Sequence, residues 1–263
     1  MHPFLATALD AAEAAAAVHR RWSGRVGVRE ATLKGVSDFV SRADVEAQQA
    51  ALAVIRTRHP HHEVLAEEDD PDQPPPSGHA PLWVVDPIDG TTNYLHGHPM
   101  YAVSIAVVVD GRPEVGVVTC PPTSERWWAT RGGGAFKNGK PIHVSDPPDL
   151  RTALVGTGFP FKAIHLLEEY LGQLGRVLRN SAGVRRGGAA ALDLAFLASG
   201  QFDAFWELDL KPWDVMAGIL LIEEAGGVVT RVDGSPIDLE PGSILGAANP
   251  EIQRAVAKLV NGP

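Results

Sequence analysis

The stretch from residue 101 to residue 144 constrains the fold most, because its apolar side chains recur at every second position. This period is typical of β-strands. Two strands are expected at 101–109 and 114–119, joined by the turn sequence Asp-Gly-Arg-Pro, and further strands at 126–130 and 141–144. Asn138-Gly139 is a hairpin signal, because both residue types tolerate the left-handed backbone of a tight turn. The first half of the chain is therefore predicted to contain an antiparallel sheet.

From residue 147 onward the pattern changes to an alternation of strands and helices, which is typical of α/β layers. We divide the chain into an α+β part, 1–146, and an α/β part, 147–263, which together form one compact unit. In the second part, strands are expected near 153–157, 202–206, 228–232 and 243–247, and helices near 164–179, 188–199, 214–225 and 250–260.

Four elements are expected before the antiparallel sheet. The spacing of apolar residues predicts helices at 4–22 and 43–58. A segment rich in Pro, Asp and Ser at 69–81 predicts a surface loop. A short apolar strand at 82–85 then ends at Asp86-Pro87.

The charge and cysteine content bear on partners and compartment. The formal net charge is −9, and affinity for nucleic-acid backbones depends on clustered Lys and Arg, so a nucleic-acid partner is not expected. The single cysteine, Cys120, excludes an intrachain disulfide and suits a reducing compartment. Asp10 and Glu13 interrupt the apolar N-terminal run, and no apolar stretch of transmembrane length follows. We therefore expect a cytoplasmic protein without a membrane partner.

Three separate segments carry acidic residues that solubility alone does not require. Three of these residues also have a structural explanation: a solvated charge run around Glu67, an ordinary turn at Asp89, and a helix N-cap at Asp214. Asp86 has no such explanation, because it follows an apolar strand at the end where open α/β sheets present ligand groups. Together the segments predict one site, formed by Glu67, Asp86, Asp89 and Asp214.

These carboxylates and the carbonyl oxygen of Ile88, without Cys or clustered His, are ligands for a hard cation, and such a set suits Mg²⁺. Neighbouring carboxylates about 4 Å apart repel by ~4 kcal/mol per pair at an effective dielectric constant of ~20. The site therefore needs divalent cations, and about two or three Mg²⁺ ions would make it attractive to phosphate. Gly90-Thr91-Thr92 adds backbone N–H groups at a helix start, which favour an anion.

Three further features favour structural roles. The glycine run at 132–134 lies in the antiparallel region, so we expect a turn rather than a phosphate loop. The sequence His-Pro-His-His at 59–62 closes a helix and lacks a second pair of ligands, which favours a surface loop over a zinc site. Cys120 ends an apolar strand and is expected to be a buried small hydrophobe.

The segment Trp-Val-Val-Asp-Pro-Ile-Asp-Gly-Thr-Thr-Asn at 83–93 and the later segment Trp-Asp…Glu-Ala-Gly-Gly at 213–227 resemble the two signatures of the inositol monophosphatase family. Glu67-Glu68 resembles its third acidic element, and the resemblance covers nearly the whole chain. It implies a layered αβαβα sugar-phosphatase fold, magnesium dependence, lithium sensitivity and a homodimer. It also implies that the substrate is a small phosphorylated polyol or sugar, hydrolysed to the alcohol and inorganic phosphate by metal-activated water.

The resemblance further implies roles for individual residues. Asp44 and Thr91 match the pair that orients the attacking water. The matches to phosphate- and substrate-binding positions are Gly90, Thr91, Ala190 and Glu207. The matches to the metal ligands are Glu67, Asp86, the Ile88 carbonyl, Asp89 and Asp214.

Spacing alone leaves alternatives for two of these residues. Asp44 fits a helix capping box with Ser41, and Glu207 fits a solvated strand end. Ala189 departs from the family, which often has Ser or Thr at this position, so the fine substrate preference stays open.

Myo-inositol monophosphate or a related ester is the expected substrate. The alternatives with the same metal chemistry are fructose-1,6-bisphosphatase, histidinol-phosphatase and 3′-phosphonucleotide phosphatase. A regulatory binding protein that retains the fold is the non-enzymatic alternative. It is disfavoured because all the ligand positions and both water-orienting positions are present.

Overall fold

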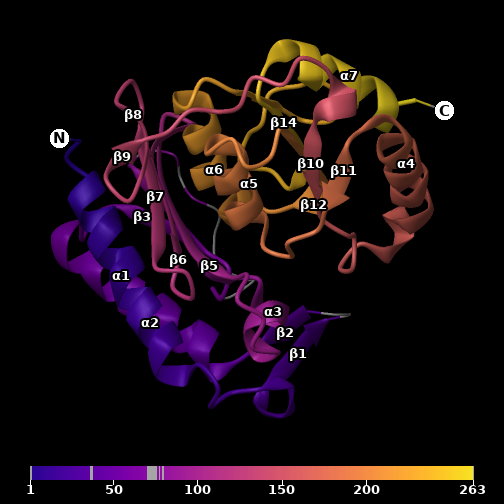
Figure 1. Cartoon of the computed structure of the whole chain (residues 1–263). Helices are drawn as coiled ribbons and strands as arrows, with labels where there is room; N and C mark the ends of the chain where they lie inside the picture. The colour runs from indigo at the N-terminus through magenta and orange to yellow at the C-terminus, as the bar shows by residue number, and fades with distance from the viewer. Residues whose placement is uncertain (1, 36–37, 70–75, 77, 79, 263) are drawn as a thin grey trace.

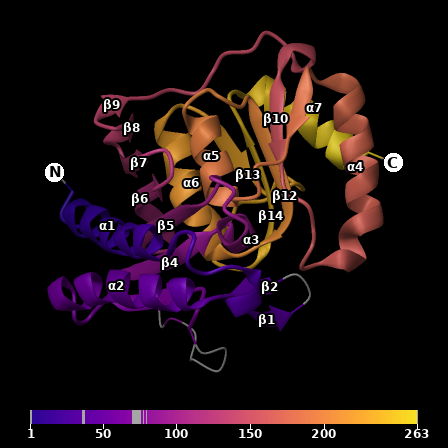
Figure 2. The ribbon, with the colours of Figure 1, turned by 60° about the horizontal axis from the view of Figure 1, so that its bottom comes forward.

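The computed structural model describes residues 2–35, 38–69, 76, 78 and 80–262. Its helices and two main sheets form five layers in the order helices, sheet, helices, sheet, helices (Figures 1 and 2). A seven-stranded sheet comes from the first half of the chain and a five-stranded sheet from the second. The layered αβαβα arrangement expected from the sequence is therefore present.

The seven-stranded sheet has its strands in chain order, so each strand pairs with the next one along the sequence. Two of its connections are tight turns in which both residues have positive φ, at Asp110-Gly111 (50° and 75°) and at Asn138-Gly139 (49° and 79°). The strands are β3 (Glu63–Ala66), β4 (Leu82–Asp89), β5 (Ala102–Val109), β6 (Arg112–Cys120), β7 (Glu125–Thr130), β8 (Gly134–Lys137) and β9 (Lys140–Pro141).

Both faces of this sheet are buried, because its central strands carry apolar residues at successive positions. Trp83 and Val85 of β4 face the outer helices α1 (Leu5–Trp22) and α2 (Arg42–Arg58). Alanines line the buried side of α1, and such small side chains let it pack closely against α2 and the sheet. The opposite face of β4 contributes to the core that contains α5 (Ala190–Ala198) and α6 (Pro212–Glu224), through Leu82 and Val84.

The five-stranded sheet has the order β11-β10-β12-β14-β13 and is mixed, with parallel and antiparallel pairs. Helices α4 (Leu167–Asn180) and α7 (Pro250–Val260) cover its outer face (Figure 2). Helices α5 and α6 lie between the two sheets, and both are buried on nearly all sides. The strands are β10 (Leu154–Thr157), β11 (Gly183–Arg185), β12 (Ala204–Leu210), β13 (Val228–Thr230) and β14 (Gly242–Ala247).

Several details differ from the sequence-based expectations. The first sheet is not wholly antiparallel, because β3, which was not predicted, pairs with β4 in parallel. The strand expected at 141–144 ends at Pro141. The short hairpin β1 (Thr32–Gly35) and β2 (Asp38–Val40) and strand β11 were also not predicted, because three or four residues are too few for a periodic pattern. Most of the predicted surface loop at 69–81 lies outside the described residues.

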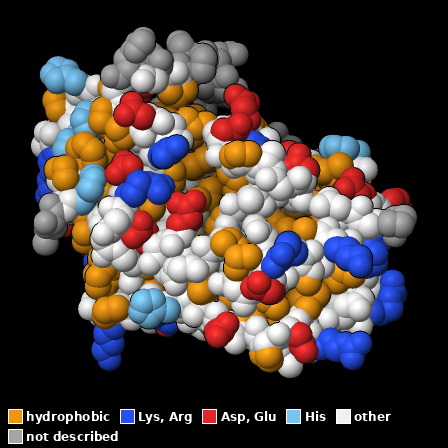
Figure 3. Space-filling view, turned by 90° about the horizontal axis from the view of Figure 1, so that it is seen from above, with side chains coloured by type: hydrophobic (Ala, Val, Ile, Leu, Met, Phe, Trp, Pro, Cys, Tyr) orange, Lys and Arg blue, Asp and Glu red, His pale blue; other side chains and the backbone are white. Residues whose placement is uncertain are grey.

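No helix among the described residues is long and apolar enough to cross a membrane. On the face shown in Figure 3, Lys and Arg side chains are interspersed with Asp and Glu side chains. That face therefore presents charges of both signs.

Candidate active site

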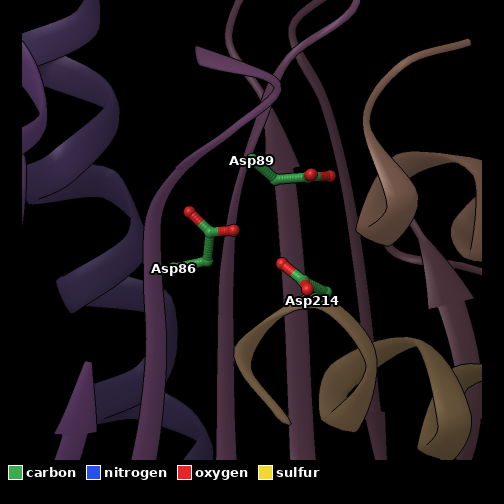
Figure 4. A group of neighbouring side chains, drawn as sticks. All are labelled: Asp86, Asp89 and Asp214. Carbon is green, nitrogen blue, oxygen red and sulfur yellow. The ribbon is translucent and has the colours of Figure 1, made fainter. Parts of the chain in front are cut away.

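Three of the four predicted carboxylate ligands converge. One carboxylate oxygen from each of Asp86, Asp89 and Asp214 lies within 4.8 Å of the others. Figure 4 shows the three side chains grouped together, two from the end of β4 and one from the first turn of α6. They line a pocket with a volume of about 610 Å³.

An irregularity in β4 brings Asp86 and Asp89 to the same side. Residues three apart in a regular strand point to opposite faces of the sheet. Here Asp86 pairs with Ser104 of β5 and Asp89 pairs with Ala102, so three steps along β4 oppose two steps along β5. This one-residue bulge turns both carboxylates into the pocket. The predicted strand end at Asp86-Pro87 is therefore wrong, since pairing continues to Asp89.

Burial and mutual repulsion make the cluster costly to ionise without a counter-charge. Burial raises the pKa of Asp86 well above its usual range, and the charges of Glu67, Asp89 and Asp214 act in the same direction. Burial, followed by the charges of Glu67 and Asp89, raises the pKa of Asp214 to about 8. The buried Oδ1 atom of Asp86 has no hydrogen-bond partner among the described residues. These features fit a site for a divalent cation.

Asp89 is held by the N-terminus of helix α5. Its carboxylate accepts hydrogen bonds from the backbone N–H groups of Ala190 (3.1 Å), Ala191 (2.8 Å) and Leu192 (3.4 Å). Free N–H groups and the helix dipole both favour a negative charge there. Burial, followed by the charge of Asp193, nevertheless raises the pKa of Asp89 to about 7.

Asp214 lies in the first turn of α6, two residues after the helix begins at Pro212. Its Oδ2 atom accepts a hydrogen bond from the backbone N–H of Lys211 at 2.7 Å, so it does cap the helix, but from within it. The hydroxyl of Ser104 donates to the carbonyl of Trp213 at 3.0 Å and ties this turn to strand β5. The capping role and the ligand role of Asp214 are thus compatible.

Glu67 follows directly after β3 and lines the same pocket. It forms an ion pair with Lys162, with Nζ and Oε1 3.6 Å apart. Its side chain is only 13% exposed, so the alternative of a solvated charge run does not describe it.

Asp44 and Thr91 are also brought together, although they come from different elements. The Thr91 hydroxyl lies 3.1 Å from Asp44 Oδ1 and 3.0 Å from the carbonyl oxygen of Ile88, and it can donate to either. The other oxygen of Asp44 accepts from the Ser41 N–H (2.8 Å) and hydroxyl (2.6 Å), which completes a capping box on α2. One carboxylate therefore serves both the cap and the pair with Thr91.

Gly90 and Ala190 have clear structural tasks. Gly90 precedes the short helix α3 (Thr91–Leu95) with φ of 88°, in the left-handed region that favours glycine. A Cβ there would lie 3.0 Å from the Met100 carbonyl oxygen and 3.2 Å from that of Gly188. The N–H of Ala190, a predicted substrate-binding residue, donates to Asp89 at 3.1 Å.

Glu207 lies within strand β12 and lines the pocket. The sequence predicted a loop between Glu207 and Pro212. This prediction is wrong, because β12 continues to Leu210. The carboxylate packs so closely on Gly158 that a Cβ there would overlap it. Burial raises the pKa of Glu207 well above its usual range, and the charges of Asp193 and Asp214 act in the same direction. The solvated strand end is therefore ruled out.

Asp193 and Arg186 are among the charged residues of this pocket that sequence reasoning missed. Asp193 on α5 is buried, and its pKa is raised to about 7 by that burial. Arg186, between β11 and α5, lines the pocket together with the loop 158–163. An aspartate inside the apolar sequence Ala-Leu-Asp-Leu-Ala was the available signal for Asp193. Arg186 gave no signal, because an arginine beside glycines is ordinary in a loop.

The weaker candidates have the structural roles expected of them. Cys120 is buried, and the glycine run at 132–134 forms the turn between β7 and β8. The rings of His59 and His62 stack at 4.7 Å, and His62 Nδ1 lies 3.0 Å from Trp83 Nε1, so the histidine-rich segment packs on aromatic neighbours.

The five layers and the carboxylate cluster define a protein of the layered sugar-phosphatase fold with a site suited to hard cations. A family model described as the inositol monophosphatase family matches residues 1–262, and the chain belongs to this family. It is 43% identical over 247 residues to a Nus factor SuhB from Pseudomonas aeruginosa, covering 93% of this chain and 91% of the relative. It is 42% identical over 240 residues to an inositol-1-monophosphatase from Mesorhizobium japonicum, covering 91% and 89%.

A solved structure agrees with this assignment. The extragenic suppressor protein suhB from Bartonella henselae superposes with a TM-score of 0.89 at 35% identity, covering 97% of each chain. The similarity therefore extends through both sheets and all five layers, and membership of the family supports a phosphatase activity.

Proposed function

We propose that this chain is a Mg²⁺-dependent phosphomonoesterase that hydrolyses myo-inositol monophosphate or a related polyol or sugar phosphate. The observation that carries the proposal is the convergence of Asp86, Asp89 and Asp214 beside the Thr91–Asp44 pair. A cation cluster and a water-orienting pair are the two parts that such a hydrolysis needs.

The proposed ligands are the carboxylates of Glu67, Asp86, Asp89 and Asp214 and the carbonyl of Ile88. The orphaned Oδ1 of Asp86 and the raised pKa values of the cluster support this set. When bound, Mg²⁺ supplies the positive charge that binds a phosphate ester and stabilises its transition state. About two or three ions would match the number of carboxylates.

The residues of the chain would orient the reactants. Thr91 directs its hydroxyl proton toward Asp44 Oδ1 or the Ile88 carbonyl, which leaves its lone pairs to accept a proton of the attacking water. The N–H groups at the start of α3, after Gly90, would bind phosphate oxygens. Glu207 would accept hydrogen bonds from hydroxyls of the leaving group.

Release of inorganic phosphate tests the proposal. The panel is inositol-1-phosphate, fructose 1,6-bisphosphate, histidinol phosphate and 3′-phosphoadenosine phosphate, each with and without Mg²⁺. We expect Mg²⁺-dependent release that is fastest with inositol-1-phosphate. Faster release from another ester would favour fructose-1,6-bisphosphatase, histidinol-phosphatase or 3′-phosphonucleotide phosphatase activity, and no release from any ester would contradict the proposal.

A binding role is the second candidate, because several relatives carry the name Nus factor SuhB. A folded, Mg²⁺-binding protein without turnover would favour it. For the same reason, the expectation of no nucleic-acid partner stays a prediction.

The homodimer, the lithium sensitivity, the cytoplasmic location and the division at residue 146 also stay predictions. Sedimentation at micromolar concentration tests the dimer, and activity at increasing Li⁺ concentration tests the sensitivity.

A further inference from the structure

Arg186 is an exposed cation on the wall of the candidate pocket. The other two cations that line this pocket are ion-paired, Lys162 with Glu67 and Lys211 with Asp209, each at 3.6 Å. Within the described part of the chain, no ion pair and no hydrogen bond is formed by the Arg186 side chain. Its five N–H donors are therefore available to a ligand.

Two aromatic rings hold this guanidinium in place. Its central carbon lies 5.2 Å from the ring centroid of Phe159 and 5.1 Å from that of Phe161. The two rings meet edge to face, with centroids 5.7 Å apart and an angle of 83° between planes. A planar guanidinium stacks through its face and donates through its edge. Because the two rings are nearly perpendicular, the guanidinium can lie face-on to at most one of them, and its N–H groups that point away from the rings can donate to an anion.

The charge of Arg186 lies on the Glu207 side of the pocket. It opposes the rise in the pKa values of Glu207 and Asp193, which burial causes. Gly188 packs directly against it, and a Cβ at that position would overlap the guanidinium. By contrast, Lys162 lies on the side of the pocket that holds the cluster of Asp86, Asp89 and Asp214. Its charge opposes the rise that burial causes in the pKa of Asp214.

We propose that Arg186 is a specificity-determining residue that binds a second anionic group, a phosphate or a carboxylate, on the leaving group of the substrate. This inference rests on the proposed function, since it assumes that the ester phosphate lies at the carboxylate cluster. Glu207 then accepts hydrogen bonds from the hydroxyl groups of the leaving group, and Arg186 binds the anionic group beyond them. Among leaving groups with matching hydroxyl groups, the one that ends in an anion is accordingly bound more tightly.

Two competing roles for this part of the pocket predict different behaviour. If the exposed rings served to stack a flat base, loss of Arg186 would leave the KM values of the sugar esters unchanged. If Arg186 only balanced the charge of Glu207 and Asp193, its loss would weaken the binding of charged and neutral leaving groups equally.

Matched pairs of esters separate anion recognition from charge balance. The first pair is 6-phosphogluconate and glucitol 6-phosphate, which differ by a carboxylate against a hydroxymethyl group. The second pair is fructose 1,6-bisphosphate and fructose 1-phosphate, which tests a phosphate as the second anion. We expect the wild-type KM to be about tenfold lower for the charged member of at least one pair.

Three variants complete the experiment. Arg186→Gln should raise the KM of the charged ester about ten- to a hundredfold, with little effect on its neutral partner or on kcat. Arg186→Lys should retain part of the preference, because lysine keeps the positive charge but lacks the planar group that donates two parallel hydrogen bonds to an anion. Arg185→Gln is the matched control, since Arg185 is also exposed but bonds its neighbour's carbonyl at Val184 and does not line the pocket. It should leave all four KM values unchanged.

A binding experiment separates the proposed function from the proposed role of Arg186. Calorimetry measures the binding of 6-phosphogluconate and of glucitol 6-phosphate to Asp44→Asn in the presence of Mg²⁺. Binding that prefers 6-phosphogluconate, together with no turnover of any ester by the wild type, would contradict the proposed function and support the role of Arg186. Turnover without a preference in either pair, or equal losses on charged and neutral esters in Arg186→Gln, would overturn the role of Arg186 alone.

Discussion

The imidazole of His19 donates a hydrogen bond from Nε2 to the carbonyl oxygen of Pro87 at a distance of 2.7 Å. A carbonyl can only accept, so Nε2 carries the proton. Burial lowers the pKa of His19 to about 4, and the ring is therefore neutral at pH 7. This contact links helix α1 to the segment between Asp86 and Asp89. It therefore supports the bulge in β4 that turns both carboxylates into the pocket.

Replacing His19 tests this support. His19→Leu leaves the buried Pro87 carbonyl without its donor, which costs about 1–3 kcal/mol and lowers Tm by roughly 2–10 °C. Because supporting contacts tune metal affinity, the Mg²⁺ concentration for half-maximal activity should rise by about tenfold. His19→Gln keeps a donor and should recover part of both losses. An unchanged Mg²⁺ requirement in His19→Leu would show that the bulge holds without this contact.

Asp89→Asn tests the carboxylate cluster. Turnover should fall by about a thousandfold or more, because the change removes a proposed metal ligand. Circular dichroism of Asp89→Asn in EDTA should show that the fold is intact, so that the lost turnover reflects the missing ligand and not unfolding. Activity near that of the wild type would refute the proposed ligand role.

Stability of the metal-free protein should fall as pH rises from 6.5 to 9. The pKa values of Asp89 and Asp214 rise from 3.8 in the unfolded chain to about 7 and 8 in the folded one. The folded state therefore keeps protons that the unfolded state has released. The resulting stabilisation is fully present below the unfolded pKa and is lost as pH passes the folded pKa values. His19 acts with the opposite sign, but at lower pH.

Melting temperatures in EDTA across this pH range check the sign. Saturating Mg²⁺ should flatten the decline, because the cation keeps the carboxylates ionised at all these pH values. A melting temperature in EDTA that stays level or rises with pH would argue against raised pKa values in the cluster.

Asp44→Asn and Ser41→Ala separate the two tasks of Asp44. Asp44→Asn should lower kcat by about tenfold or more with little change in KM, since orienting the water matters in the transition state. Ser41→Ala removes the cap partner and should cost about 1 kcal/mol of stability with kcat retained. Steady-state kinetics and thermal melts of both variants give the answer. A similar fall in kcat for both would assign the effect to the cap.

Glu207→Gln should change the ratio between two substrates. A charged acceptor makes hydrogen bonds worth roughly 1.5–3 kcal/mol, so kcat/KM for inositol-1-phosphate should fall about ten- to a hundredfold. p-Nitrophenyl phosphate has no neighbouring hydroxyl groups and should be far less affected. Equal losses on both esters would mean that Glu207 supports the pocket in general, and the polyol preference would be withdrawn.

The elements with a strong pattern were predictable from the sequence. Helices α1, α2 and α7 and strands β5 and β6 begin and end within a few residues of their predicted bounds. The two hairpin turns were also predictable, because Asp-Gly and Asn-Gly favour positive φ through local sterics. Strands β3 and β11 were not, because their pairing partners rather than their own sequences stabilise these short segments.

The sequence by itself determined which three aspartates form the cluster, since segments 83–93 and 213–227 carry a pattern that local spacing and resemblance suffice to recognise. Only the tertiary structure decided how they meet. The bulge in β4 depends on its pairing with β5, and Asp214 reaches Asp89 because α6 packs between the two sheets. The roles of His19 and Arg186 likewise arise from neighbours that lie far away in the chain. Periodicity and capping act between adjacent residues, whereas burial, pKa shifts and convergence depend on the packing of the layers.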